Sequence, residues 1–153
     1  METYYQEILD LLERLHGEIH TAVKGLSQEA VDWAPGPEMN SMGVLLAHMA
    51  GSEKYWLGEV VAAAGSERDR AAEFATQGVP LEALLARLED SLRFCRGVLA
   101  GLKIADLPAP RISPRDGRQV TVGWALAHGL QHIGQHCGHL QVTRQFYDLS
   151  SQS

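Results

Sequence analysis

Hydrophobic residues recur at intervals of three and four positions in four separate blocks of the chain. This spacing places them on one face of an α-helix, which completes a turn every 3.6 residues. No other segment argues for a sheet, although residues 118–122 could form a short extended entry into the last block. The pattern therefore predicts four amphipathic helices, whose apolar stripes cover residues 8–26, 42–60, 81–102 and 126–140.

Residues that begin and end helices lie at the block boundaries. All six prolines fall between the blocks or at their edges, as expected of a residue that breaks helix interiors. Asn40 and Ser41 are good caps for the second helix, Pro80 suits the first position of the third, and the fourth opens near Thr121. The sequence predicts an all-α four-helix bundle that forms a single domain over residues 1–153.

The three connections between the predicted helices are long. Residues 25–40, 65–79 and 103–120 all exceed the usual length of a helix–helix link. Long connections permit a crossover topology, and loops at the ends of a bundle can form the rim of a pocket.

Composition and charge exclude several classes of protein. The chain has 153 residues with 13 Lys and Arg against 19 Asp and Glu, a net charge of −6 that argues against nucleic-acid binding. No apolar stretch is long enough to span a bilayer, and the polar, acidic first residues do not resemble a secretory signal. Both cysteines, Cys95 and Cys137, fall within apolar helical patterns. We expect a cytoplasmic protein with a small-molecule substrate and no nucleic-acid or membrane partner.

Four of the seven histidines fall in one twelve-residue segment, 128–139, of the last predicted helix. On a helical wheel His136 and His132 lie about 80° and 120° from the core direction, at the edge of the buried face. His128 and His139 turn further, toward solvent or a partner. Because His132 and His136 are four positions apart, their rings project together, as in helical zinc sites with an HExxH motif.

A third histidine, His48, lies about 60° from the apolar direction of the second helix, beside Ser52. If the second and fourth helices are neighbours, His48, His132 and His136 can converge inside the bundle. Three imidazoles and an open position compose a catalytic metal site, suited to Zn, Ni, Cu or Fe. The alternative is that these are hydrogen-bonded histidines at the edge of the core. A second HxxxH pair, His16 and His20, is expected on the surface of the first helix.

Glu53 lies at the margin of the same apolar face as His48. It is a candidate catalytic residue, either as a general base or as an acceptor that orients a ligand imidazole. The alternative is an ion pair at the end of the bundle. Trp56 and Trp124 could line a pocket, although aromatic residues on a helix face are more often core. Cys137 is interpreted as a small buried hydrophobe.

Glycines recur in two of the predicted helices although each costs roughly 1 kcal/mol of helix propensity relative to alanine. Their repetition suggests close approach of another helix, either within the bundle or across a dimer interface. The residues concerned are Gly51, Gly58, Gly129, Gly134 and Gly138.

Two motifs resemble the DinB/YfiT-like superfamily. The second helix reads H-x4-E-x2-W from His48 to Trp56, and the last carries an HxxxH motif, His132 to His136, followed closely by Gly138. The Trp33-Ala-Pro35 step and the Arg115-Asp-Gly-Arg118 segment are also similar to that superfamily. The resemblance covers nearly the whole chain in the order of its elements.

This resemblance implies a four-helix bundle with crossover connections, commonly assembled as a homodimer. It also implies one divalent metal per chain, with zinc and nickel as the first candidates, held by His48, His132 and His136. Members include S-transferases that use bacillithiol or mycothiol and relatives of maleylpyruvate isomerase. The leading hypothesis is a metal-dependent enzyme that activates a low-molecular-weight thiol. The alternatives are a hydrolase that uses a metal-bound water, a non-catalytic dimer that binds a metal or small ligand, and a metal-free interaction protein.

Overall fold

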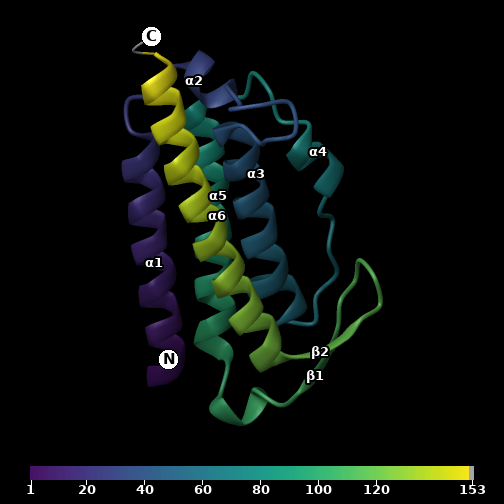
Figure 1. The fold of residues 1–153 in the computed structure, drawn as a ribbon. Helices are drawn as coiled ribbons and strands as arrows, with labels where there is room; N and C mark the ends of the chain where they lie inside the picture. The colour runs from purple at the N-terminus through teal and green to yellow at the C-terminus, as the bar shows by residue number, and fades with distance from the viewer. Residues whose placement is uncertain (152–153) are drawn as a thin grey trace.

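Four long helices lie alongside one another in the computed structural model, which describes residues 1–151 (Figure 1). Helices α1 and α3 each pack against both α5 and α6, and the π-helix η1 continues α3 directly. The successive long helices α1 and α3 are therefore diagonal, which requires a connection across the end of the bundle. The predicted four-helix bundle is confirmed. Its long helices are α1 (Thr3–Val23), α3 (Met42–Glu53) with its continuation η1 (Lys54–Val60), α5 (Leu81–Gly101) and α6 (Val122–Ser150).

The long connections contain short elements of their own. Strand β2 confirms the predicted extended entry into the last helix, and it pairs antiparallel with β1, which the sequence did not predict. Helix α4 was also not predicted; the Asp69 side chain caps it by accepting a hydrogen bond from the Ala72 amide. These elements are α2 (Gln28–Asp32), α4 (Arg70–Phe74), the 3₁₀-helix η2 (Ile104–Asp106), β1 (Pro110–Ile112) and β2 (Gln119–Thr121). Within residues 1–151 no helix has the length and apolar character needed to cross a membrane.

The apolar core falls into two clusters with a polar layer between them. One cluster packs the first half of α1 against η1, and the other packs the second half of α1 against α3. His16, Glu53 and Ser91 lie between the two clusters along their helices and are all buried. The prediction that His16 is a surface residue is therefore wrong. The wheel was centred on Leu15, which is only partly buried, whereas α1 packs against both α5 and α6 and so buries a wider arc.

Three of the glycines mark close approaches within the bundle. A Cβ on Gly129 would lie 2.7 Å from Cγ of buried Leu57, and one on Gly58 would lie 2.5 Å from the Phe94 ring. A Cβ on Gly51 would meet the Glu73 side chain. Gly134 and Gly138 have no such neighbour among residues 1–151, so contact with a second copy of the chain stays a prediction for these two.

We expect Gly129→Ala to be less stable than Gly17→Ala by about 1–3 kcal/mol, the usual cost of overpacking a core. Both variants gain the same helix propensity, but Gly17 is exposed with nothing near its Cβ position. Denaturant unfolding of the two proteins measures the difference. Equal stability would show that Leu57 yields to the added methyl group without cost.

Candidate metal centre

Helices α3 and α6 bring three histidines together at their interface, as the sequence predicted. His48 on α3 is buried, and His132 and His136 on successive turns of α6 are half-buried. One ring nitrogen from each lies within 4.8 Å of the others. These residues form the histidine cluster, and its partial exposure leaves a route for a ligand from solvent.

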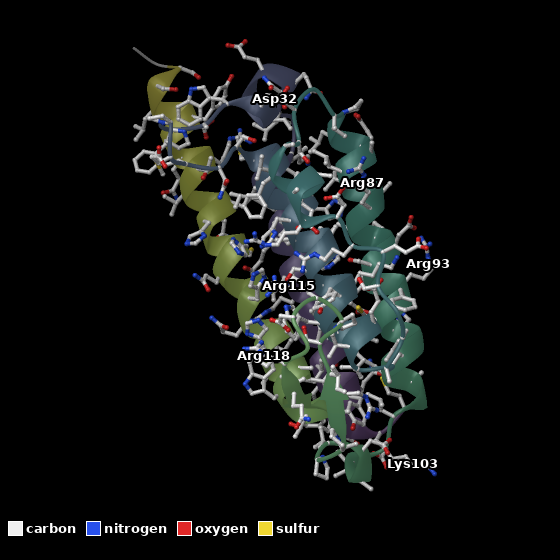
Figure 2. All side chains as sticks on the ribbon, turned by 90° about the vertical axis from the view of Figure 1, so that its right-hand side faces the viewer. Asp32, Arg87, Arg93, Lys103, Arg115 and Arg118 are labelled. Carbon is white, nitrogen blue, oxygen red and sulfur yellow. The ribbon has the colours of Figure 1, made fainter. Side chains whose placement is uncertain are left out.

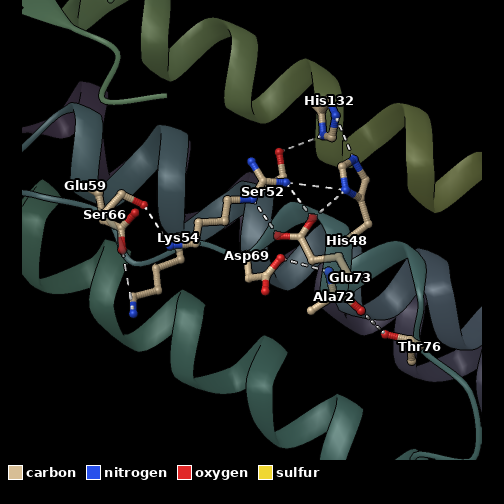
Figure 3. Close-up of polar contacts among 11 residues, drawn as sticks. His48, Ser52, Lys54, Glu59, Ser66, Asp69, Ala72, Glu73, Thr76 and His132 are labelled. Carbon is tan, nitrogen blue, oxygen red and sulfur yellow. Dashed lines mark hydrogen bonds and ion pairs between the residues drawn. The ribbon is translucent and has the colours of Figure 1, made fainter. Parts of the chain in front are cut away.

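The His48 ring is held by a carboxylate from the 65–79 connection (Figure 3). Its Nδ1 lies 2.8 Å from Oε2 of Glu73. Arg68 donates two hydrogen bonds to the same carboxylate, from Nε to Oε1 at 2.6 Å and from Nη2 to Oε2 at 2.8 Å. Burial raises the pKa of Glu73, but the hydrogen bonds and charges of Arg68 and His48 outweigh it and leave the pKa below its usual value. The carboxylate is ionised and can only accept, so the hydrogen in its 2.8 Å contact with His48 belongs to Nδ1. Arg68 Nη2 also lies 3.4 Å from this nitrogen, a longer contact than that of the carboxylate. In the neutral ring with this tautomer, Nε2 carries the lone pair.

The lone pair of His48 points at His132. The two Nε2 atoms are 3.4 Å apart, and Nδ1 of His132 lies 3.1 Å from Oγ of Ser52. If His132 donates from Nδ1 to Ser52, two lone pairs face each other across 3.4 Å. If Ser52 donates instead, His132 offers its Nε2 hydrogen to His48 over a long distance. A cation between the rings favours the first arrangement, because it removes the repulsion between the lone pairs.

His136 completes the cluster. Its Nδ1 is buried and has no hydrogen-bond partner among residues 1–151, which is costly for a polar atom. Burial, together with the charges of His48 and His139, lowers the pKa of His136 to about 4. Burial and the other cluster histidines lower the pKa of His132 to about 3. Both rings are therefore neutral near pH 7, the state in which imidazole binds a metal.

These observations fit a divalent transition metal. Two nitrogens bound tetrahedrally at about 2.0–2.1 Å from one ion lie roughly 3.3–3.4 Å apart. The observed separation of 3.4 Å between the His48 and His132 nitrogens matches that value. Neutral rings, an opposed pair of nitrogens and an unpartnered buried nitrogen are all features that a metal accounts for.

Glu53 does not join the histidine cluster. Its carboxylate is fully buried and bonds to His16 Nε2 at 2.8 Å and to Ser91 Oγ at 2.7 Å, within the polar layer of the core. The acceptor that orients a cluster imidazole is Glu73 instead. The other interpretation of Glu53, a structural pair at the end of the bundle, is closer to what is observed, but the Glu53–His16 pair lies inside the bundle and not at its end.

Glu73 and Arg68 were missed because nothing in their local sequence marks them. The available signal was the length of the 65–79 connection, which predicted a rim but not which of its charged residues turns inward. Both side chains are shielded, with only 8% of Arg68 and 10% of Glu73 exposed. A buried Arg–Glu pair inside a connection depends on where helix α4 packs, and that is a tertiary property.

A group of aromatic and basic side chains lies next to the histidine cluster, on the side toward the hairpin that β1 and β2 form. Trp124 stacks on His128 with ring centroids 4.6 Å apart, and the Arg118 guanidinium lies 4.4 Å from the Trp124 ring. Figure 2 labels Arg115 and Arg118, which lie in the loop that joins β1 to β2. Trp56 is buried as expected for core, whereas Trp124 is 39% exposed, which corrects the core interpretation for that residue. Cys137 is buried, as predicted.

Comparisons with known proteins agree with this fold. Residues 7–149 match the mycothiol-S-transferase family. A conserved protein from Enterococcus faecalis has a similar structure, with a TM-score of 0.78 at 16% identity, covering 95% of this chain and 97% of that one. YfiT from Bacillus subtilis, described as "a probable metal-dependent hydrolase with an unusual four-helix bundle topology", has a TM-score of 0.76 at 15% identity, covering 95% of this chain and 89% of its own. A search of curated proteins finds no match. The family match spans nearly the whole chain and the two structures share its fold, so the chain belongs to the mycothiol-S-transferase family of the DinB/YfiT-like superfamily.

Proposed function

We propose that the protein is a metal-dependent S-transferase that joins a low-molecular-weight thiol, with mycothiol as the first candidate, to an electrophilic small molecule. The observation that supports this most directly is the convergence of ring nitrogens from His48, His132 and His136 within 4.8 Å of one another, on one buried and two half-buried residues. His48, His132 and His136 would hold one divalent ion, with zinc and nickel as the first metals to test. Membership of the mycothiol-S-transferase family supports the choice of thiol.

A divalent ion in such a site lowers the pKa of a ligated thiol or water and so supplies a nucleophile near neutral pH. The protein's own residues prepare the site. Glu73 accepts the Nδ1 hydrogen of His48 and leaves its Nε2 free, and Ser52 can do the same for His132. The half-buried edges of His132 and His136 leave the cluster open to a small molecule.

The reacting thiol must come from a co-substrate. Burial and the adjacent Glu18 raise the pKa of the Cys137 thiol to about 11, and burial raises the pKa of Cys95 even further. Both thiols are buried and protonated near pH 7, so neither is a competent nucleophile. In the transfer step the co-substrate thiol loses its proton to solvent water, its sulfur bonds to the electrophilic carbon, and the leaving group departs into solvent with the electron pair of the bond that breaks.

The test is thioether formation from mycothiol and a fluorogenic alkyl halide, with glutathione and cysteine as comparison thiols. We expect activity in the zinc- or nickel-loaded protein, loss on removal of metal by a chelator, and recovery when the ion is restored. A metal-loaded protein that hydrolyses activated esters but forms no thioether would support the hydrolase function that YfiT's description suggests. A protein that catalyses neither reaction would overturn the proposal in favour of a non-catalytic metal-binding role.

A further inference from the structure

The connection between α3 and α5 enters the bundle at one point, where Glu73 and Arg68 meet His48. Glu73 is carried on the short helix α4, which packs against α3. Figure 3 shows the Glu73 carboxylate reaching His48 from the side opposite His132. Arg68 holds both carboxylate oxygens, so Glu73 cannot turn away from His48 without breaking two charged hydrogen bonds.

Gly51 makes room for this pair. A Cβ at this position would overlap Oε1 of Glu73, lie 2.7 Å from its Cδ, and lie 3.3 Å from Nε of Arg68. Gly51 has no positive φ, so its backbone conformation does not require glycine. The glycine in the middle of a helix is therefore explained by the space that the carboxylate occupies, three residues from His48.

We propose that Arg68 and Glu73 are positioning residues for the metal centre, and that Gly51 is the space in α3 that admits them. The pair fixes His48 with its hydrogen on Nδ1, so that Nε2 faces His132 and His136 with a free lone pair. The inference rests on the proposed function, because it assigns the pair a role toward the metal that the three histidines would hold.

We expect Glu73→Ala to weaken zinc binding by about 10–100-fold, the usual effect of removing a partner that orients a metal-bound histidine. Gly51→Ala should weaken it in the same direction, because the new methyl group displaces the flexible end of Glu73 while the fold is retained. Zinc affinity is measured by competition with a chromophoric chelator, and circular dichroism confirms that each variant is folded.

Two variants serve as matched controls. Gly134→Ala adds the same methyl group to α6, two residues from both His132 and His136 in the sequence, and should leave zinc affinity unchanged. In the described part of the chain nothing outside the local helix backbone and the adjacent residues lies within 4 Å of the added carbon. Glu89→Ala removes the carboxylate of a comparable but exposed pair with His20 and should also leave it unchanged.

The double variant Gly51→Ala/Glu73→Ala separates positioning from general damage to the helix. If Gly51 acts only by admitting Glu73, the double variant binds zinc as tightly as Glu73→Ala alone. Additive losses would show that Gly51→Ala harms the site by another route and would overturn the role given to Gly51.

Nitrogen NMR of the metal-free protein gives a readout that does not depend on metal. The wild type should show His48 protonated at Nδ1, and Glu73→Ala should show a mixture of tautomers. Wild-type protein that binds no zinc would contradict the proposed function, whereas wild-type and Glu73→Ala proteins with equal zinc affinity and the same His48 tautomer would overturn the positioning role alone.

Discussion

Replacing His132 with alanine is expected to abolish tight metal binding. The His132 side chain supplies one of the three converging nitrogens and the one that faces His48 at 3.4 Å, so its removal leaves two imidazoles on different helices. The loss in zinc or nickel affinity should exceed the roughly 100-fold upper range expected for an orienting partner such as Glu73. His48→Ala and His136→Ala should behave alike, and transferase activity should fall with metal content in all three.

Elemental analysis of the purified proteins measures the metal content, and thermal unfolding with and without a chelator supplies an independent readout. A metal that binds only the native state stabilises it, so a chelator should lower the melting temperature of the wild type but not of His132→Ala. His20→Ala is the matched control, since His20 is a half-exposed histidine on α1 that lies outside the histidine cluster and bonds to Glu89. Full metal content in His132→Ala would refute the assignment of the histidine cluster.

Replacing Glu53 with alanine is expected to cost about 3–5 kcal/mol of unfolding free energy, the usual result of breaking one side of a buried polar pair. The carboxylate is 0% exposed and bonds to both His16 and Ser91. Alanine therefore leaves the buried His16 ring without this partner, whereas Ser91 keeps its hydrogen bond to the Leu88 carbonyl. Within residues 1–151 His16 already has an unpartnered Nδ1, and there the bond to Glu53 is its one hydrogen bond, so losing it makes the burial of His16 more costly still.

Urea unfolding measures this loss, with Glu13→Ala as the matched control. Glu13 also joins α1 to α5, through Arg96, but both side chains are about half exposed, so its removal should cost no more than about 1 kcal/mol. Glu53→Gln keeps an acceptor in place and gives a folded protein if alanine does not. A Glu53→Gln variant with wild-type stability and zinc affinity but no transferase activity would instead establish the catalytic role first considered for this residue.

The sequence determined the bundle because the spacing of apolar residues within each segment is enough to predict a helix and the face that it buries. The three- and four-residue spacing of apolar residues located all four long helices. His48, His132 and His136 could be selected as a set because positions on a helix fix the direction in which a side chain projects. The spacing of the last two guaranteed that their rings project together, and only the adjacency of α3 and α6 remained to be shown.

The tertiary structure decided which polar residues meet. His16 was placed on the surface because a wheel gives directions relative to one chosen centre, whereas the packing of α1 against two helices buries a wider arc. Glu53 and Glu73 are alike as single residues, yet the first stabilises the core and the second orients His48. Glu73 lies 25 residues from its histidine, in a connection without a repeating pattern, and the space it occupies depends on a glycine in another helix. Contacts of this kind depend on how the 65–79 connection packs against α3. The sequence by itself could therefore name the three histidines but not the groups that hold them in position.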